Sequence, residues 1–133
     1  MEFDKAWTYD SSGGRWKWYT TFKNYRRDLW SVNHTMGLWA NVTSECNLTV
    51  AGVVPAQTTI HLHKGWNLVS FPSHNASYSV SDLKAEISAT RVEGYDPTPP
   101  YHLRVLGDAE VLLAGYGYWV KVDIDLDWIV EVS

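Results

Sequence analysis

Short runs rich in aromatic residues, Val and Thr recur along the chain, and in Arg15–Tyr19 polar and aromatic residues alternate with a period of two, which is the pattern of a β-strand. The strands predicted from such runs are Lys5–Tyr9, Arg15–Thr20, Gly37–Val42, Asn47–Ala51, Thr58–His63, Trp66–Phe71, Arg91–Tyr95, Tyr101–Leu106, Gly117–Val122 and Asp127–Val132. The first six are expected to form three successive hairpins, the last of them around a turn at Lys64-Gly65. The chain is therefore expected to be mainly β.

One segment departs from these strand patterns and predicts a helix, from Ser79 to Ile87. Ser79 is suited to cap its amino end, and Asp82 falls in the first turn. Val80, Leu83 and Ile87 recur at helical spacing and would lie on one face. A single short amphipathic helix is therefore expected among the strands.

The two halves of the chain resemble each other. GLWANVTSECNLTV, from Gly37, matches GYWVKVDIDLDWIV, from Gly117, at an offset of 80, which places Trp39 on Trp119. Upstream, Tyr9-Asp10 matches Tyr95-Asp96 at an offset of 86, and in both places turn residues follow. Matches in the same order over about forty residues indicate an internal duplication.

The chain of 133 residues is predicted to form one domain, residues 1–133, with repeat halves at about 5–62 and 63–133. We expect an antiparallel β-sandwich or barrel with an internal pseudo-two-fold repeat. The strand Gly65–Pro72, GWNLVSFP, opens the second unit. The first unit lacks a matching Gly-Trp-Asn strand and helix, so the chain is expected to begin partway into a unit, which makes strand exchange with another copy a hypothesis.

Composition and charge narrow the class of protein. Eight Trp, eight Tyr and three Phe favour strands. A net charge of −4 argues against nucleic acid as a partner. No apolar run is long enough to span a membrane, no signal peptide is recognisable, and Cys46 is the only cysteine, so no internal disulfide is expected. The chain is thus expected to be either cytosolic or a piece of something longer.

Four sequence triplets favour an extracellular location. Four of the six asparagines stand in N-x-S/T triplets, where chance would supply roughly one. The candidate glycosylation sites are Asn33, Asn41, Asn47 and Asn75. We therefore expect a secreted or cell-surface glycoprotein, although Ser/Thr-rich β-proteins also collect such triplets incidentally.

Candidate catalytic and metal-binding patterns are weak. The chain has no GxSxG, Walker or HExxH motif. His61 and His63 fall on one face of a strand but lack a third ligand, and Asp123, Asp125 and Asp127 lack the spacing of a calcium loop. No enzyme activity, metal site or cofactor is expected.

Aromatic residues are the best candidates for ligand binding. Trp16, Tyr19 and Trp30 are candidate carbohydrate-binding residues, because flat aromatic faces stack on sugar rings. The alternative for Trp16 and Trp18 is burial in a core, since Tyr101 and Leu103 stand in their places in the second half. Trp39 and Trp119 are both expected to be core residues.

The motifs KGWNLVSFPS, VEGYD and GYGYWVKV together resemble a tandem repeat of archaeal and some bacterial cell-surface proteins, in which GWNL, YD and GYW recur. The resemblance covers nearly the whole chain and implies no catalytic residues. It implies a non-catalytic extracellular module with a structural or adhesive role, whose partners are neighbouring modules or other surface proteins. The alternative that the residues leave open is a carbohydrate-binding module whose partner is a polysaccharide.

Overall fold

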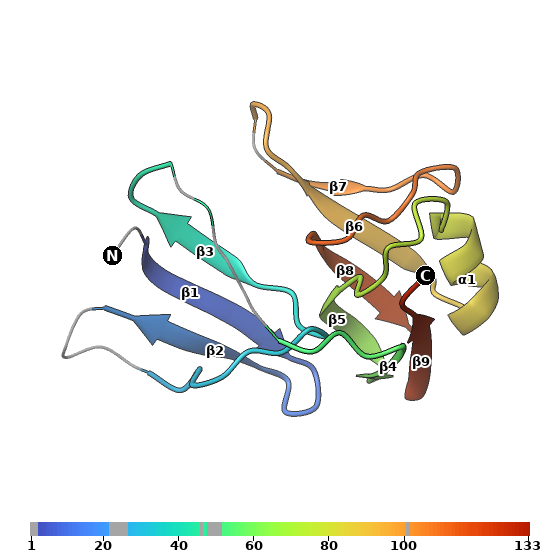
Figure 1. Ribbon diagram of the computed structural model, residues 1–133, viewed down its shortest axis with the longest axis horizontal. Coiled ribbons are helices and arrows are strands. Elements are labelled where there is room, and N and C mark those ends of the chain that lie inside the picture. Colours follow the sequence, from blue (N-terminus) through green and yellow to red (C-terminus); the bar gives the residue numbers. More distant parts are fainter. Residues whose placement is uncertain (1–2, 22–26, 46, 48–51, 101) are drawn as a thin grey trace.

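The computed structural model describes residues 3–21, 27–45, 47, 52–100 and 102–133. This part of the chain is mainly β, as predicted, with one short helix (Figure 1). Its elements are β1 (Phe3–Asp10), β2 (Arg15–Thr20), β3 (Trp39–Val42), β4 (Gln57–Leu62), β5 (Gly65–Ser70), α1 (Val80–Ile87), β6 (Arg91–Asp96), β7 (His102–Val105), β8 (Gly117–Val122) and β9 (Leu126–Glu131).

The strands form three antiparallel sheets. The N-terminal sheet has the order β2-β1-β3, the large sheet has the order β5-β8-β6-β7, and β4 pairs with β9. Among the described residues none of these sheets closes into a barrel. The predicted β1–β2 hairpin is confirmed, whereas the predicted partner of Gly37–Val42 falls on Asn47–Ala51, of which 48–51 lie outside the described residues.

The predicted hairpin between Thr58–His63 and Trp66–Phe71 is wrong. Both strands exist, but β4 pairs with β9, and β5 pairs with β8. The chain bends sharply at Gly65, whose φ of +102° is the left-handed region that glycine adopts without strain. The bend carries β5 away from β4, so the two segments belong to different sheets.

Asn67 holds this bend together from inside. Its side chain is 1% exposed. The Oδ1 atom accepts a hydrogen bond from the N–H of His63, and Nδ2 donates to the carbonyl oxygens of His63, Gly65 and Val120 at 2.9, 3.2 and 3.3 Å. The asparagine of the Gly-Trp-Asn motif therefore satisfies backbone groups that a tight hairpin would have paired.

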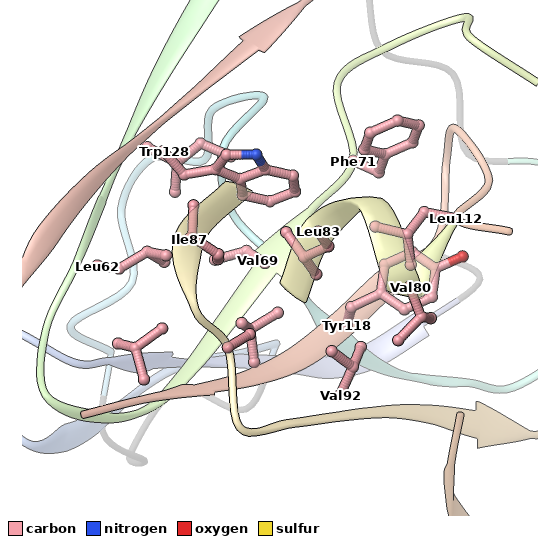
Figure 2. Close-up of a cluster of buried hydrophobic side chains, with 14 of the residues drawn as sticks. Leu62, Val69, Phe71, Val80, Leu83, Ile87, Val92, Leu112, Tyr118 and Trp128 are labelled. Carbon is pink, nitrogen blue, oxygen red and sulfur yellow. The ribbon is translucent and has the colours of Figure 1, made fainter. Parts of the chain in front are cut away.

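One face of the large sheet carries the hydrophobic core (Figure 2). Helix α1 and the β4–β9 pair cover this face, and Trp128 is the largest side chain buried there. As predicted, Val80, Leu83 and Ile87 form the buried face of the helix. Ser79 and Asp82 form a capping box, each accepting a hydrogen bond from the other's backbone N–H.

The N-terminal sheet lies on the other side of the large sheet from α1 (Figure 1). The segment that leads into β3 hydrogen-bonds to the large sheet, from Gly37 N–H to the Leu68 carbonyl and from Ser70 N–H to the Thr35 carbonyl. Within the described residues, no helix has the length and apolar character needed to cross a membrane.

Candidate functional site

The largest concentration of aromatic side chains lies where the two sheets meet, and we call it the aromatic interface. Because Trp7 and Tyr9 of β1 pair with Trp18 and Trp16 of β2, and Trp7 also pairs with Trp39 of β3, these five rings share one face of the N-terminal sheet. The large sheet contributes Tyr95 and Trp119 from its face opposite the core.

Three of these indoles form a ladder across the N-terminal sheet. Trp7 stacks on Trp18 with centroids 5.2 Å apart, and on Trp39 at 6.5 Å on its other side. The interplanar angles are 21° and 15°, so both faces of the Trp7 ring lie against neighbouring indoles. Cross-strand aromatic pairs of this kind stabilise a sheet, and they leave Trp7 without a flat face for a ligand.

The contacts between the sheets are reciprocal. Tyr9 of the N-terminal sheet packs on Trp119 of the large sheet, with centroids 5.7 Å apart. Tyr95 of the large sheet packs on Trp39 of the N-terminal sheet at 5.2 Å. Each sheet therefore contributes a tyrosine that packs on the other sheet's tryptophan.

The same two groups of strands also agree in pairing. In the N-terminal sheet β1 lies between β2 and β3, and in the large sheet β6 lies between β7 and β8. Trp39 of β3 pairs with Trp7 of β1, and Trp119 of β8 pairs with Glu93 of β6. Glu93 lies 86 residues beyond Trp7, which is also the offset between the two Tyr-Asp motifs. We call β1-β2-β3 and β6-β7-β8 the two strand units.

The turns that follow β1 and β6 contain the same hydrogen bonds. Asp10 Oδ1 accepts hydrogen bonds from the N–H and hydroxyl of Ser12, and Asp96 Oδ1 accepts the same pair from Thr98. The hydroxyl hydrogen bonds are the main cause that lowers the pKa of each carboxyl below its ordinary value. The aspartate of each Tyr-Asp motif therefore accepts the hydrogen bonds that hold the turn after it.

The three candidate carbohydrate-binding residues lie in different surroundings. Trp16 is half-buried in the aromatic interface, edge-on to Tyr9 and Trp119 at 5.3 and 5.7 Å. Tyr19 points to the opposite face of β2 from Trp16, because the two residues are an odd number of positions apart in the strand. The guanidinium of Arg27 lies over the Tyr19 ring. Trp30 is 73% exposed and lies outside the strands. Trp16 and Tyr19 therefore do not face a common site.

The expectation that Trp39 and Trp119 are core residues needs correction. Both are half-buried and lie in the aromatic interface, outside the hydrophobic core. Trp119 faces away from α1, because the alternate residues of β8, Tyr118, Val120 and Val122, supply the core. Trp39 lies on β3, in the N-terminal sheet. Trp18 is half-buried too. Strand pairing also sets Leu103 opposite Tyr95, as Trp16 stands opposite Tyr9, so Leu103 corresponds to Trp16 rather than to Trp18.

His61 and His63 line a surface depression of about 530 Å³ at the ends of β4 and β9, together with Asp125 and Asp127. His61 Nδ1 lies 2.6 Å from Asp127 Oδ1, and Asp125 Oδ1 accepts a hydrogen bond from the Lys64 N–H. Within the described residues no three His, Cys, Asp or Glu side chains are placed to hold a metal ion. Both side chains of the His61–Asp127 pair are exposed to solvent.

The four candidate glycosylation sites differ in environment. Asn33, Asn41 and Asn47 are exposed, and Asn75 is half-buried. In the triplets of Asn33 and Asn75, the Asn Oδ1 accepts hydrogen bonds from the N–H and the hydroxyl of the residue two positions on, Thr35 and Ser77. Asn41 Nδ2 instead donates to Asp4 Oδ1 at 2.8 Å.

Sequence reasoning missed Trp7 and Tyr95 as interface residues, although the alternation of Trp7 and Tyr9 in β1 carried the signal for an aromatic sheet face.

Comparison of the chain with protein-family models, with curated proteins and with solved structures gave no match.

Proposed function

We propose that this chain is a non-catalytic extracellular module of a larger surface protein, with a structural or adhesive role. The observation that carries the proposal is the equivalence of the two strand units in order, pairing and turns. We interpret the units as parts of two copies of one repeat, in halves of about 5–62 and 63–133, packed as a sandwich around the large sheet. Repeat modules of this kind bury their faces against neighbouring units, and arrays of them build extended surface proteins.

The use of the aromatic residues supports a structural role. Six of the eight tryptophans lie in ring contacts around the junction of the two sheets, and Trp128 lies in the core. Aromatic side chains bring large buried areas to an interface, so this composition suits a module whose role is to hold its units together. The exposed Asn33, Asn41 and Asn47 triplets favour an extracellular setting.

Cell-surface labelling tests the proposal. An antibody raised against the purified module should label intact cells of the organism that encodes it, and mild protease treatment of those cells should remove the signal. An antibody against a cytosolic protein serves as the control and should label only permeabilised cells. Labelling of the module that appears only after permeabilisation would refute the extracellular role.

Carbohydrate binding is the second candidate function, and the exposure of Trp30 favours it. A tryptophan ring that is 73% exposed has a free surface on which a sugar ring can stack. Titration with soluble polysaccharides should then shift the tryptophan fluorescence of the wild-type chain, and Trp30→Ala should abolish the shift. Tyr116→Ala, which removes another exposed ring, is the matched control. A wild-type spectrum that no polysaccharide changes would contradict this candidate.

A further inference from the structure

The outer edge of β3 differs from the equivalent edge in the large sheet. Strand β8 lies between β6 and β5, and β5 pairs with it along its whole length from Gly65 to Ser70. Strand β3 pairs with β1 on one side, and no strand of the described residues pairs with its other side. The N-terminal sheet therefore has three described strands at positions where the large sheet has four.

The residues on the face beside this edge are also more exposed than those at the same places in the large sheet. Ala6 and Ala40 pair with each other as Val92 and Val120 do in the large sheet. Both valines are 0% exposed, whereas Ala6 is half-buried and Ala40 is exposed.

The next position shows the same contrast. Val42 is 54% exposed, while Val122, the matching residue 80 positions on, is 1% exposed. Apolar residues thus stand on the N-terminal sheet at the positions that the large sheet buries.

In the large sheet, α1 and the β4–β9 pair together cover the corresponding face, and one segment supplies both the added strand and the helix. The segment Gly65–Ile87 supplies β5, which pairs with β8, and α1, which buries Val80, Leu83 and Ile87 in the core. Strand β5 presents buried side chains on both faces, Leu68 on one and Asn67 and Val69 on the other. A strand with that pattern suits a position in which both sides of a sheet are covered.

We propose that the outer edge of β3 and the face formed by Ala6, Ala40 and Val42 bind a strand-and-helix segment of the same kind as Gly65–Ile87, contributed by another repeat unit. The strand adds to β3 through backbone hydrogen bonds, as β5 adds to β8, and the helix covers Ala40 and Val42. This inference deepens the proposed role, because it rests on the equivalence of the two units. It assigns the surface through which one module joins the next.

A peptide-binding experiment with the full chain tests the inference. A fluorescein-labelled peptide of sequence Gly65–Ile87 is titrated with the chain, and the fluorescence anisotropy is measured. Saturable binding is expected for the wild type. Val42→Asp should weaken it at least about tenfold, because a carboxylate would be buried without a partner. Val53→Asp is the matched control, since Val53 is 97% exposed and lies outside this surface, and it should bind as the wild type does.

Two further measurements make the result specific. A peptide that carries Leu68→Pro should bind at least about tenfold more weakly, because proline disrupts strand pairing. Light scattering during size-exclusion chromatography at the same concentrations detects self-association. A dimer that Val42→Asp dissociates, in a chain that binds no peptide, would show that the edge pairs with a second copy and would overturn the inference.

Absence of saturable binding, or equal binding to Val42→Asp and Val53→Asp, would overturn it too. These outcomes are separate from the cell-surface labelling, which does not depend on Val42. A module that labels intact cells but binds no peptide refutes the joining surface alone.

Discussion

Gly37 and Gly117 lie against each other where the two sheets meet: a Cβ atom added to Gly117 would stand 3.5 Å from the Cα of Gly37. The two glycines precede Trp39 and Trp119 by the same two residues. Their packing brings the starts of β3 and β8 together, so the reciprocal tyrosine–tryptophan contacts form on either side of this point.

The two glycines should respond differently to alanine. A Cβ on Gly37 would meet the Leu68 side chain at 2.8 Å and the Val69 carbonyl oxygen at 2.9 Å, so Gly37→Ala requires the backbone to move. We expect it to lower the free energy of unfolding by about 1–3 kcal/mol. Gly117→Ala makes only ordinary van der Waals contacts and should cost less than about 1 kcal/mol. Urea unfolding of both variants measures the difference, and equal losses would contradict this packing.

The aromatic interface should contribute a measurable coupling energy. In a double-mutant cycle, Trp39→Ala and Tyr95→Ala should show an interaction of about 0.5–1.5 kcal/mol, because the two rings pack edge-on at 5.2 Å. The same cycle with Trp39→Ala and Tyr116→Ala, which removes an exposed ring, should show a coupling near zero. If both cycles give the same value, the coupling does not arise from the ring contact.

Replacement of Asn67, the asparagine of the Gly-Trp-Asn motif, should lower the stability of the fold. Replacement by alanine leaves the His63 N–H and the carbonyl oxygens of His63 and Gly65 without their side-chain partner. The expected loss in the free energy of unfolding is about 1–3 kcal/mol. Gln57→Ala removes an exposed amide that donates to Glu131, and its cost should stay below about 0.5 kcal/mol. A neutral Asn67→Ala variant in thermal or urea unfolding would refute the role assigned to this side chain.

Acid should destabilise the chain through the two equivalent turns. The hydrogen bonds from Ser12 and Thr98 lower the pKa values of Asp10 and Asp96 in the folded state. Their stabilisation is therefore fully present above the unfolded pKa of about 3.9 and is lost as the pH falls through the lower folded values.

The double variant Asp10→Asn, Asp96→Asn keeps an oxygen acceptor in each turn but cannot titrate there. Its urea midpoint should fall less than that of the wild type between about pH 5 and pH 2.5. Asp123→Asn removes an exposed carboxylate elsewhere and is the control. A double variant with the same pH dependence as the wild type would show that these turns do not carry the effect.

Local patterns predicted the elements well, because they depend on neighbouring residues. The Ser79 capping box with Asp82, the helix face of Val80, Leu83 and Ile87, and the strand Gly117–Val122 all follow from spacing along the chain. The alternation of Trp7 with Tyr9 and of Trp16 with Trp18 likewise sets which of their rings share a face, since a strand's register fixes that face.

Which distant strands pair with each other could not be read from local patterns and depends on the tertiary structure. The apolar character of Trp66–Phe71 predicts a strand, but only the packing against β8, with the bend at Gly65 and the hydrogen bonds of Asn67, turns it away from its neighbour β4. Likewise, alternation assigns Trp39 and Trp119 to a sheet face without saying which face receives the helix. Sequence patterns were enough to locate most of the strands, the helix and its cap, because helix capping and side-chain periodicity act within a few residues. The tertiary structure decided which strands pair and that the tryptophans join two sheets, because burial depends on which faces meet.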